Sequence, residues 1–200
     1  MTWKDLTLLQ YENLKSLADT DRSRFANNAI EYLFGVKQPE VTLPLYEYSK
    51  YLKELQFFSE PMPKAKLGNA EWTLNGTTYK ADLVIANFSA VQFMDWRTYT
   101  SQPNKSIIDL LSVVLVPEGH KYNDGSYDLE KAKDDIGTMS AVDANALLFF
   151  FANYFRIFVT TSLDSLRKKM KRMKKLPKDK VQEIVSKLEE MKTLVEQITT

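Results

Sequence analysis

The stretch from Ala144 to Val159, ANALLFFFANYFRIFV, is the most apolar part of this 200-residue chain and decides its fold. It contains Asn145, Asn153 and Arg156 within about 16 residues, whereas a helix that crosses a bilayer needs roughly 20 largely uncharged residues. The stretch therefore predicts a buried helix in the core of a soluble domain and no membrane span. The core predicted here consists of Leu147, Leu148, Phe150, Phe151, Phe155 and Ile157, packed mostly against Phe93, Trp96, Ile108 and Leu111.

Downstream of this stretch, apolar residues recur at alternating spacings of three and four, up to and beyond a break at Pro177. Before the break they are Val159, Leu163, Leu166, Met170 and Met173, and after it Val181, Ile184, Leu188, Met191, Val195 and Ile198. Two heptad seams around a short break are typical of an antiparallel helical hairpin. Its first arm, from Ser140 to Leu176, would extend about 55 Å. This is longer than a domain of this size, so we expect the hairpin to project or to lie along a partner.

A cluster of basic residues, RKKMKRMKKLPKDK, surrounds the break. From Arg167 to Lys180 there are nine basic residues and one acidic residue, a net charge of +8, while the other 18 basic and 25 acidic residues give −7. Such a cluster binds an acidic protein surface or phosphates, or it is a solvated tip that keeps the hairpin soluble. Aromatic residues that could stack on single-stranded bases are missing from it, which makes nucleic acid the less favoured partner. The candidate partner-binding residues are Arg167, Lys168, Lys169, Lys171, Arg172, Lys174, Lys175, Lys178 and Lys180.

A β-hairpin is predicted near residues 71–80, because Asn75-Gly76 is the dipeptide preferred in a type I′ turn. A lone hairpin is marginal in water, so we expect it to pack on helices or to pair with a third strand at Leu83–Ile85. Directly after it, Ser89 and Gln92 form a capping box that starts an aromatic-rich helix.

Further helix signals lie on both sides of the hairpin. A capping box at Thr2 and Asp5 predicts a first helix with Leu6, Leu9, Leu14 and Leu17 on one face. Helices are also predicted from Asp21 to Leu33, ended by Gly35, and after Pro44, with Leu45, Tyr48, Leu52 and Leu55 facing inward. A helix from Lys105 to about Val116 is closed by Pro117, and Ser140 with Asp143 caps the long helix.

No group of residues in the sequence resembles a catalytic or metal site. There is no cysteine, and His120 is the only histidine, so a second nitrogen ligand is missing. Asn123, Asp124 and Asp128 do not follow the calcium-loop pattern and are typical of an Asx turn. Asp134 and Asp135 are adjacent and would point in different directions on a helix. We therefore predict a non-enzyme without catalytic residues, cofactor or metal.

Three segments resemble small phage morphogenesis proteins. They are LNGTTYKADLVIANFSAVQFMDW (residues 74–96), IIDLLSVVLVPEGHKYN (107–123) and IGTMSAVDANALLFFFANYF (136–155). They look like parts of the tail-assembly or baseplate-hub assembly chaperones of T4-like phages and their relatives in phages of the Bacteroides group. The resemblance implies a protein that helps to build a phage particle, in the bacterial host cytoplasm or in the virion. It implies other phage structural or tail proteins as partners, and it carries over no catalytic residue.

These observations predict a mainly α (α+β) fold in two parts. Residues 1–158 form a helical body with a small β-hairpin, and residues 159–200 form a C-terminal helical-hairpin arm continuous with the body helix. The expected function is phage morphogenesis through protein–protein contacts, as an assembly chaperone or a virion component, with a homo-oligomer as a further expectation. The alternative is a DNA-binding accessory protein that uses the basic tip, and an enzyme is a distant third.

Overall fold

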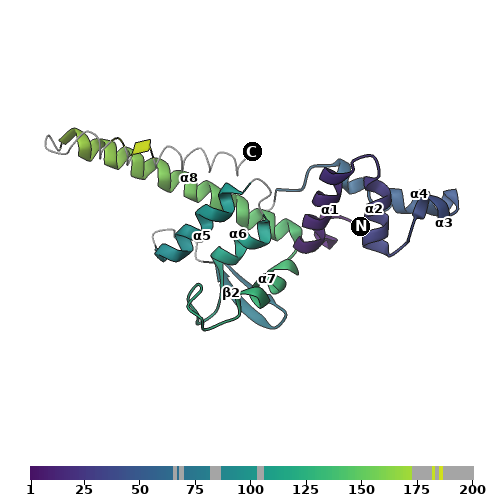
Figure 1. Ribbon diagram of the computed structural model, residues 1–200, viewed down its shortest axis with the longest axis horizontal. Coiled ribbons are helices and arrows are strands. Elements are labelled where there is room, and N and C mark those ends of the chain that lie inside the picture. The colour runs from purple at the N-terminus through teal and green to yellow at the C-terminus, as the bar shows by residue number, and fades with distance from the viewer. Residues whose placement is uncertain are drawn as a thin grey trace.

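The computed structural model describes residues 1–64, 67, 70–81, 87–102, 106–172, 182, 185 and 186 (Figure 1). The described part contains eight α-helices and one three-stranded antiparallel sheet, which confirms the mainly α (α+β) fold. The helices are α1 (Leu8–Thr20), α2 (Phe25–Phe34), α3 (Pro39–Thr42), α4 (Leu45–Glu54), α5 (Ala90–Ser101), α6 (Ile107–Val114), α7 (Leu129–Gly137) and α8 (Ala141–Arg172). The strands are β1 (Glu71–Leu74), β2 (Thr77–Ala81) and β3 (Leu115–Pro117), and two 3-10 turns are η1 (Trp3–Asp5) and η2 (Gln56–Ser59).

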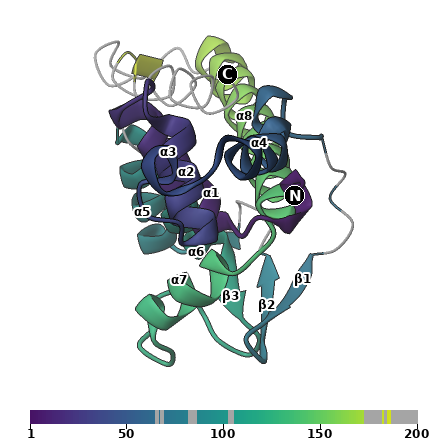
Figure 2. The ribbon, with the colours of Figure 1, turned by 90° about the vertical axis from the view of Figure 1, so that its right-hand side faces the viewer.

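The molecule is elongated (Figure 1). Helices α1–α4 lie at one end, α8 runs toward the other end, and α5, α6, α7 and the sheet lie beneath the first half of α8. Figure 2 shows the sheet and α7 together at the bottom of the view, below α2, α3 and α4. Helix α8 is therefore the element that links the body to the far end of the molecule.

The predicted β-hairpin is confirmed. Leu74 pairs with Thr77, so Asn75 and Gly76 form a two-residue loop between β1 and β2. Both loop residues have positive φ, 47° and 83°, as a type I′ turn requires. The turn chemistry thus sets the register of the hairpin.

The third strand of the sheet is β3, which pairs antiparallel with β2. The strand predicted at Leu83–Ile85 lies outside the described residues. The prediction that α6 continues to about Val116 is wrong, because the helix ends at Val114 and the next three residues are strand. Pro117 disfavours the helical conformation at the residue before it. The free edge of β2 then provides backbone partners for this segment.

The N-terminal segment differs from its prediction. Asp5 accepts a hydrogen bond from the Thr2 amide at 2.7 Å, but this capping box starts only the 3-10 turn η1. Helix α1 begins later, where Thr7 and Gln10 form a second capping box. Leu9 consequently points to solvent rather than into the core.

Helices α2 and α4 pack with α1 around a smaller core that contains Leu6, Leu14 and Ile30. Helix α2 ends at Gly35, which has φ of 69°, as predicted, but it begins at Phe25 rather than at Asp21. In α4, which follows Pro44 as predicted, Tyr48 packs on this core and Leu55 is buried. Leu45 and Leu52 are exposed, contrary to the prediction, because the side of α4 that carries Tyr48 and Tyr51 is the one that packs on this core.

The larger core lies between the sheet, α5, α6, α7 and the first half of α8. Helix α5 starts at the predicted capping box, in which the Ser89 hydroxyl accepts from the Gln92 amide at 3.1 Å. The Gln92 side chain is buried and donates to the Val113 carbonyl at 2.7 Å, which ties α5 to α6. The largest fully buried side chains of this core are Leu8, Tyr79, Trp96, Phe151, Leu110, Leu111, Leu115, Ile136 and Met139.

Two contacts fix the N-terminal helices to the larger core. Leu8 donates to the Met139 carbonyl at 2.7 Å, and Ala141 donates to the Leu6 carbonyl at 2.9 Å. In addition, the Glu12 carboxylate of α1 accepts hydrogen bonds from the first amides of α6 and from Ser106. An acidic side chain at a helix N-terminus satisfies amides that have no partner within the helix. The start of α8 is therefore anchored to both cores.

Candidate interaction surface on helix α8

The first half of α8 is held in place by aromatic contacts with α5. Phe151 is fully buried, and its ring lies 4.4 Å from that of Trp96 and 5.5 Å from that of Phe88, between centroids. Phe155, one turn later, packs on Phe93 and Trp96 at 6.2 Å. These contacts confirm that Phe151 and Phe155 belong to the core and pack against Phe93 and Trp96. They also fix the rotation of α8 about its axis.

The second half of α8 extends beyond α5 and α6 (Figure 1). With 32 residues the helix is about 48 Å long, since each residue adds 1.5 Å. The prediction of a long helix that leaves the body is consistent with this arrangement up to Arg172. The second arm of the predicted hairpin, with its seam from Val181 to Ile198, lies almost entirely outside the described residues.

The structure places five of the nine predicted partner-binding residues at the end of α8. They are Arg167, Lys168, Lys169, Lys171 and Arg172, and of these side chains only that of Lys168 is described, as exposed. Lys174, Lys175, Lys178 and Lys180 lie outside the described residues. A basic segment therefore continues from the part of α8 that projects from the body.

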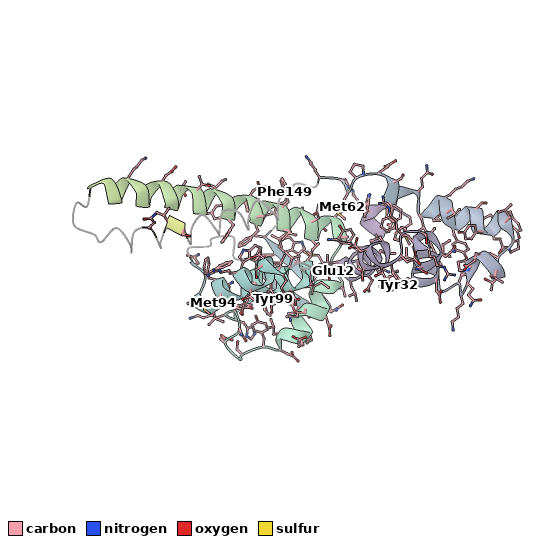
Figure 3. The ribbon with its side chains drawn as sticks, turned by 45° about the horizontal axis from the view of Figure 1, so that its top comes forward. Glu12, Tyr32, Met62, Met94, Tyr99 and Phe149 are labelled. Atoms are coloured by element: carbon pink, nitrogen blue, oxygen red, sulfur yellow. The ribbon has the colours of Figure 1, made fainter. Side chains whose placement is uncertain are left out.

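An apolar strip on α8 was not predicted from the sequence. Phe149, Phe150, Tyr154 and Ile157 have exposed fractions of 54, 40, 38 and 56%, and we call these four residues the aromatic strip. The Phe150 and Tyr154 rings are stacked, with centroids 6.5 Å apart. Figure 3 shows Phe149 on the upper side of α8, away from α5 and α6.

The aromatic strip corrects two core predictions. Phe150 and Ile157 were expected in the core, together with Leu147, Leu148, Phe151 and Phe155, which are buried. The stretch ANALLFFFANYFRIFV is apolar around the whole helix, so its pattern does not indicate which side meets the body. The body covers only the side that carries Phe151 and Phe155. Exposed large apolar side chains that lie next to one another are typical of interaction surfaces.

The only histidine, His120, lies in the loop between β3 and α7. Its Nδ1 atom is 2.7 Å from the Ser126 hydroxyl, and its ring contacts that of Tyr127 edge to face. Asp124 accepts from the Ser126 amide at 2.9 Å, which is the predicted Asx turn. Within the described ranges, no three acidic or histidine side chains are grouped so that they could hold a metal ion. This loop is thus held by its own turns and rings.

Asp135 is the most unusual ionisable group in the described part of the chain, because it is a buried acid with three side-chain donors. It accepts from Tyr79 and Lys131 at 2.7 Å and from Asn75 at 2.9 Å. Burial by itself raises the pKa of Asp135, but the hydrogen bonds from Lys131, Asn75 and Tyr79 outweigh burial and hold the pKa below its ordinary value. Burial and the bond to Asp135 raise the pKa of Tyr79.

This network joins α7 to the turn of the β-hairpin. Every polar atom of the Asp135 side chain is bonded to the protein, so the arrangement stabilises the sheet rather than offering a reactive group. From the sequence, Asp134 and Asp135 were considered on a helix only as an unsuitable carboxylate pair, and where α7 begins and ends was not predicted. Asp128 is the signal for that helix, since its side chain accepts from the Glu130 and Lys131 amides at 3.0 and 3.2 Å and caps α7.

Comparison with protein-family models, with curated proteins and with solved structures gave no match. None of the helices in the described part of the chain is both long enough and apolar enough to span a bilayer. The surface of α8 is therefore the feature from which a function can be argued.

Proposed function

We propose that this chain is a phage morphogenesis protein, either an assembly chaperone or a virion component, that acts through protein–protein contacts made by α8. The observation that carries the proposal is the projection of α8 from the body (Figure 1). The helix carries exposed apolar side chains near its middle and basic residues at its end. A long exposed helix of this kind adds surface for contacts without adding to the core.

The segments that resemble phage assembly proteins support this proposal by their position. They contribute Tyr79 and Trp96, Leu110 and Leu111, and Phe151 to the larger core. These segments thus build the part of the molecule that anchors α8. The segments that carry the resemblance and the first half of α8 therefore lie in the same core.

The charge distribution favours an acidic protein surface as the partner of the basic end. The segment from Arg167 to Lys180 carries a net charge of +8, whereas the rest of the chain carries −7. An exposed ion pair contributes at most about 1 kcal/mol, so binding by such an end is collective. It is also sensitive to salt, because charges are screened over about 10 Å at 0.1 M.

The experiment uses two variants with the same change in charge. The first replaces six residues of the basic end with glutamine: Lys168, Lys169, Lys171, Arg172, Lys174 and Lys175. The control replaces six exposed lysines of the body with glutamine: Lys4, Lys15, Lys37, Lys53, Lys64 and Lys121. Each is co-expressed with the proteins encoded by neighbouring genes, and co-purification is measured at about 50 mM and 500 mM salt.

We expect the parent and the body variant to retain a partner at low salt and the basic-end variant to lose it. Retention of the same partner by a folded basic-end variant would show that the end is only a solvated cap. The DNA-binding alternative has a different signature. Duplex DNA would bind the parent, and the logarithm of its binding constant would fall steeply and linearly with the logarithm of the salt concentration. No single protein would then co-purify with the parent.

A further inference from the structure

The aromatic strip cannot be buried by a rotation of α8. Phe151 and Phe155 fill the space between α8 and α5, and turning Phe150 inward would expose both of them. Within the described part of the chain, the strip is therefore exposed to water. Its exposed apolar area favours an occupant from outside the described body.

The predicted C-terminal arm lies almost entirely outside the described residues, and its sequence pattern assigns it to another side of α8. Its partner positions on α8 are those of the heptad seam, beginning at Val159 and Leu163. Ile157 and Val159 are two positions apart, and residues two positions apart point about 200° apart on a helix. An arm packed on that seam would therefore lie on the side of α8 away from Ile157.

Exposed charged residues of opposite sign lie beyond the two ends of the strip. Asp143, near the start of α8, and Lys168, near its end, are both exposed. They are about seven turns apart, so they point in nearly the same direction and lie about 38 Å from each other. Phe150 and Ile157 lie between them on the same line. Asp164 is also exposed on this side, so the positive end begins at Lys168.

This order of charges makes the surface complementary to itself. In an antiparallel pair of α8 helices, Asp143 of each copy faces Lys168 of the other, and the aromatic strips meet near the middle. A parallel pair would place like charges side by side. A surface that binds its own copy through a two-fold axis has this kind of self-complementarity.

We propose that the aromatic strip binds a second copy of the chain, with the two α8 helices antiparallel. Aromatic side chains bury roughly 150–250 Å² each, so the exposed parts of the four residues offer about 350 Å². Stable interfaces bury about 800 Å² on each partner, which makes this dimer weak and dependent on concentration. Such a dimer can form whether or not the basic end binds another protein.

The first test measures self-association by sedimentation velocity from about 1 to 500 µM, a range suited to a weak dimer. The test variant combines Phe149→Gln with Ile157→Gln, and the control combines Val91→Gln with Met94→Gln, two exposed residues of α5 (Figure 3). We expect the parent and the control to dimerise alike, and the strip variant to show a dissociation constant raised about tenfold or more. All positions are exposed, so thermal melts should show folded proteins throughout.

The second test determines orientation and uses the absence of cysteine from the chain. A chain with Asp143→Cys is mixed with a chain with Lys168→Cys, and a bis-maleimide of about 10 Å, close to the distance between packed helices, is added. An antiparallel dimer places the two thiols side by side and leaves the other Asp143–Lys168 pair intact. We expect cross-linking in the mixture, and none in either chain by itself.

Three results would overturn the proposal: a parent that stays monomeric over the whole range, a strip variant that dimerises like the parent, or cross-linking of the Lys168→Cys chain with itself. If the parent is monomeric and the strip variant loses a co-expressed protein partner, the occupant is that protein and not a second copy. Failure of the proposed function looks different. There the dimer forms, but no partner is lost when the basic end is changed.

Discussion

Alanine substitutions in the run Phe149-Phe150-Phe151 test the orientation of α8, on which the rest depends. The three residues have the same side chain and lie next to one another, but only Phe151 is buried. Its ring contacts those of Trp96 and Phe88, and nothing in its surroundings can fill the space that Phe151→Ala would leave without moving α5 or the sheet.

The expected costs differ because of this burial. Phe151→Ala should lower the free energy of unfolding by about 3–5 kcal/mol, the range for loss of an aromatic side chain from a packed core. Phe149→Ala and Phe150→Ala leave no closed cavity, since water fills the space. About half of each side chain is buried, so each should cost only about 1–1.5 kcal/mol.

The assay is a urea titration of each variant, followed by circular dichroism at about 1 µM, where a weak dimer is dissociated. Equal slopes with urea would show that the substitutions act on the folded state and not on the compactness of the unfolded chain. A cost below about 1 kcal/mol for Phe151→Ala, or a larger cost for Phe150→Ala than for Phe151→Ala, would refute the orientation of α8.

Three further substitutions test the elements that hold α8 in place. Asp135→Asn should lower stability by about 2 kcal/mol at pH 7. Folding lowers the pKa of Asp135, so the carboxylate stabilises the folded state fully above its ordinary pKa, and this stabilisation is lost as the pH falls through the pKa of the folded state. Urea titrations at pH 7 and pH 3 should therefore show a smaller stability difference between the parent and Asp135→Asn at pH 3. Gly76→Ala should lower the free energy of unfolding by about 1–2 kcal/mol. The cost comes from the φ of 83° alone, because nothing lies within 4 Å of the added methyl group, and an unchanged urea midpoint would argue against the turn. Glu12→Ala should cost about 1 kcal/mol and Glu12→Gln less, since glutamine still accepts from the amides of α6.

Local signals in the sequence predicted local structure well. Asn75-Gly76 defined the hairpin and its register, and Ser89 with Gln92 defined the start of α5, because these residues act on their own backbone. Helix α7 was not placed, because the signal at its start is ambiguous. An aspartate such as Asp128 is typical of an Asx turn and of a helix cap, and the sequence around it does not distinguish the two.

Features that depend on distant segments were predicted less well. The edge of β2 draws Leu115–Pro117 into the sheet, and this pairing partner is not visible in the α6 sequence. Leu45 and Phe150 were assigned to the core because they are apolar and at helical spacing. Which side of α4 or α8 is covered depends on how the other helices pack, and a periodic pattern that is apolar on several sides leaves that open.

The candidate surface was therefore predicted only in part. Charge and the length of the helix indicated its basic end, because neither depends on packing. Two residues of the aromatic strip, Phe150 and Ile157, were assigned to the core because they are apolar, and Phe149 and Tyr154 were not assigned at all. The exposed Lys168 and the strip lie on one side of the same helix, and this connection came from the structure.

The central claim is that the projecting part of α8 is where this protein meets its partner, and hydrogen exchange tests it most directly. Amides at the end of a helix that extends from the body open easily and exchange fast in the free protein. The measurement compares the chain with and without its co-purified partner, at about 1 µM so that self-association does not contribute. We expect slower exchange in peptides from about Ile157 to Arg172, with little change in α1–α4 and the sheet. Slower exchange confined to α1–α4 or the sheet, with α8 unchanged, would contradict it.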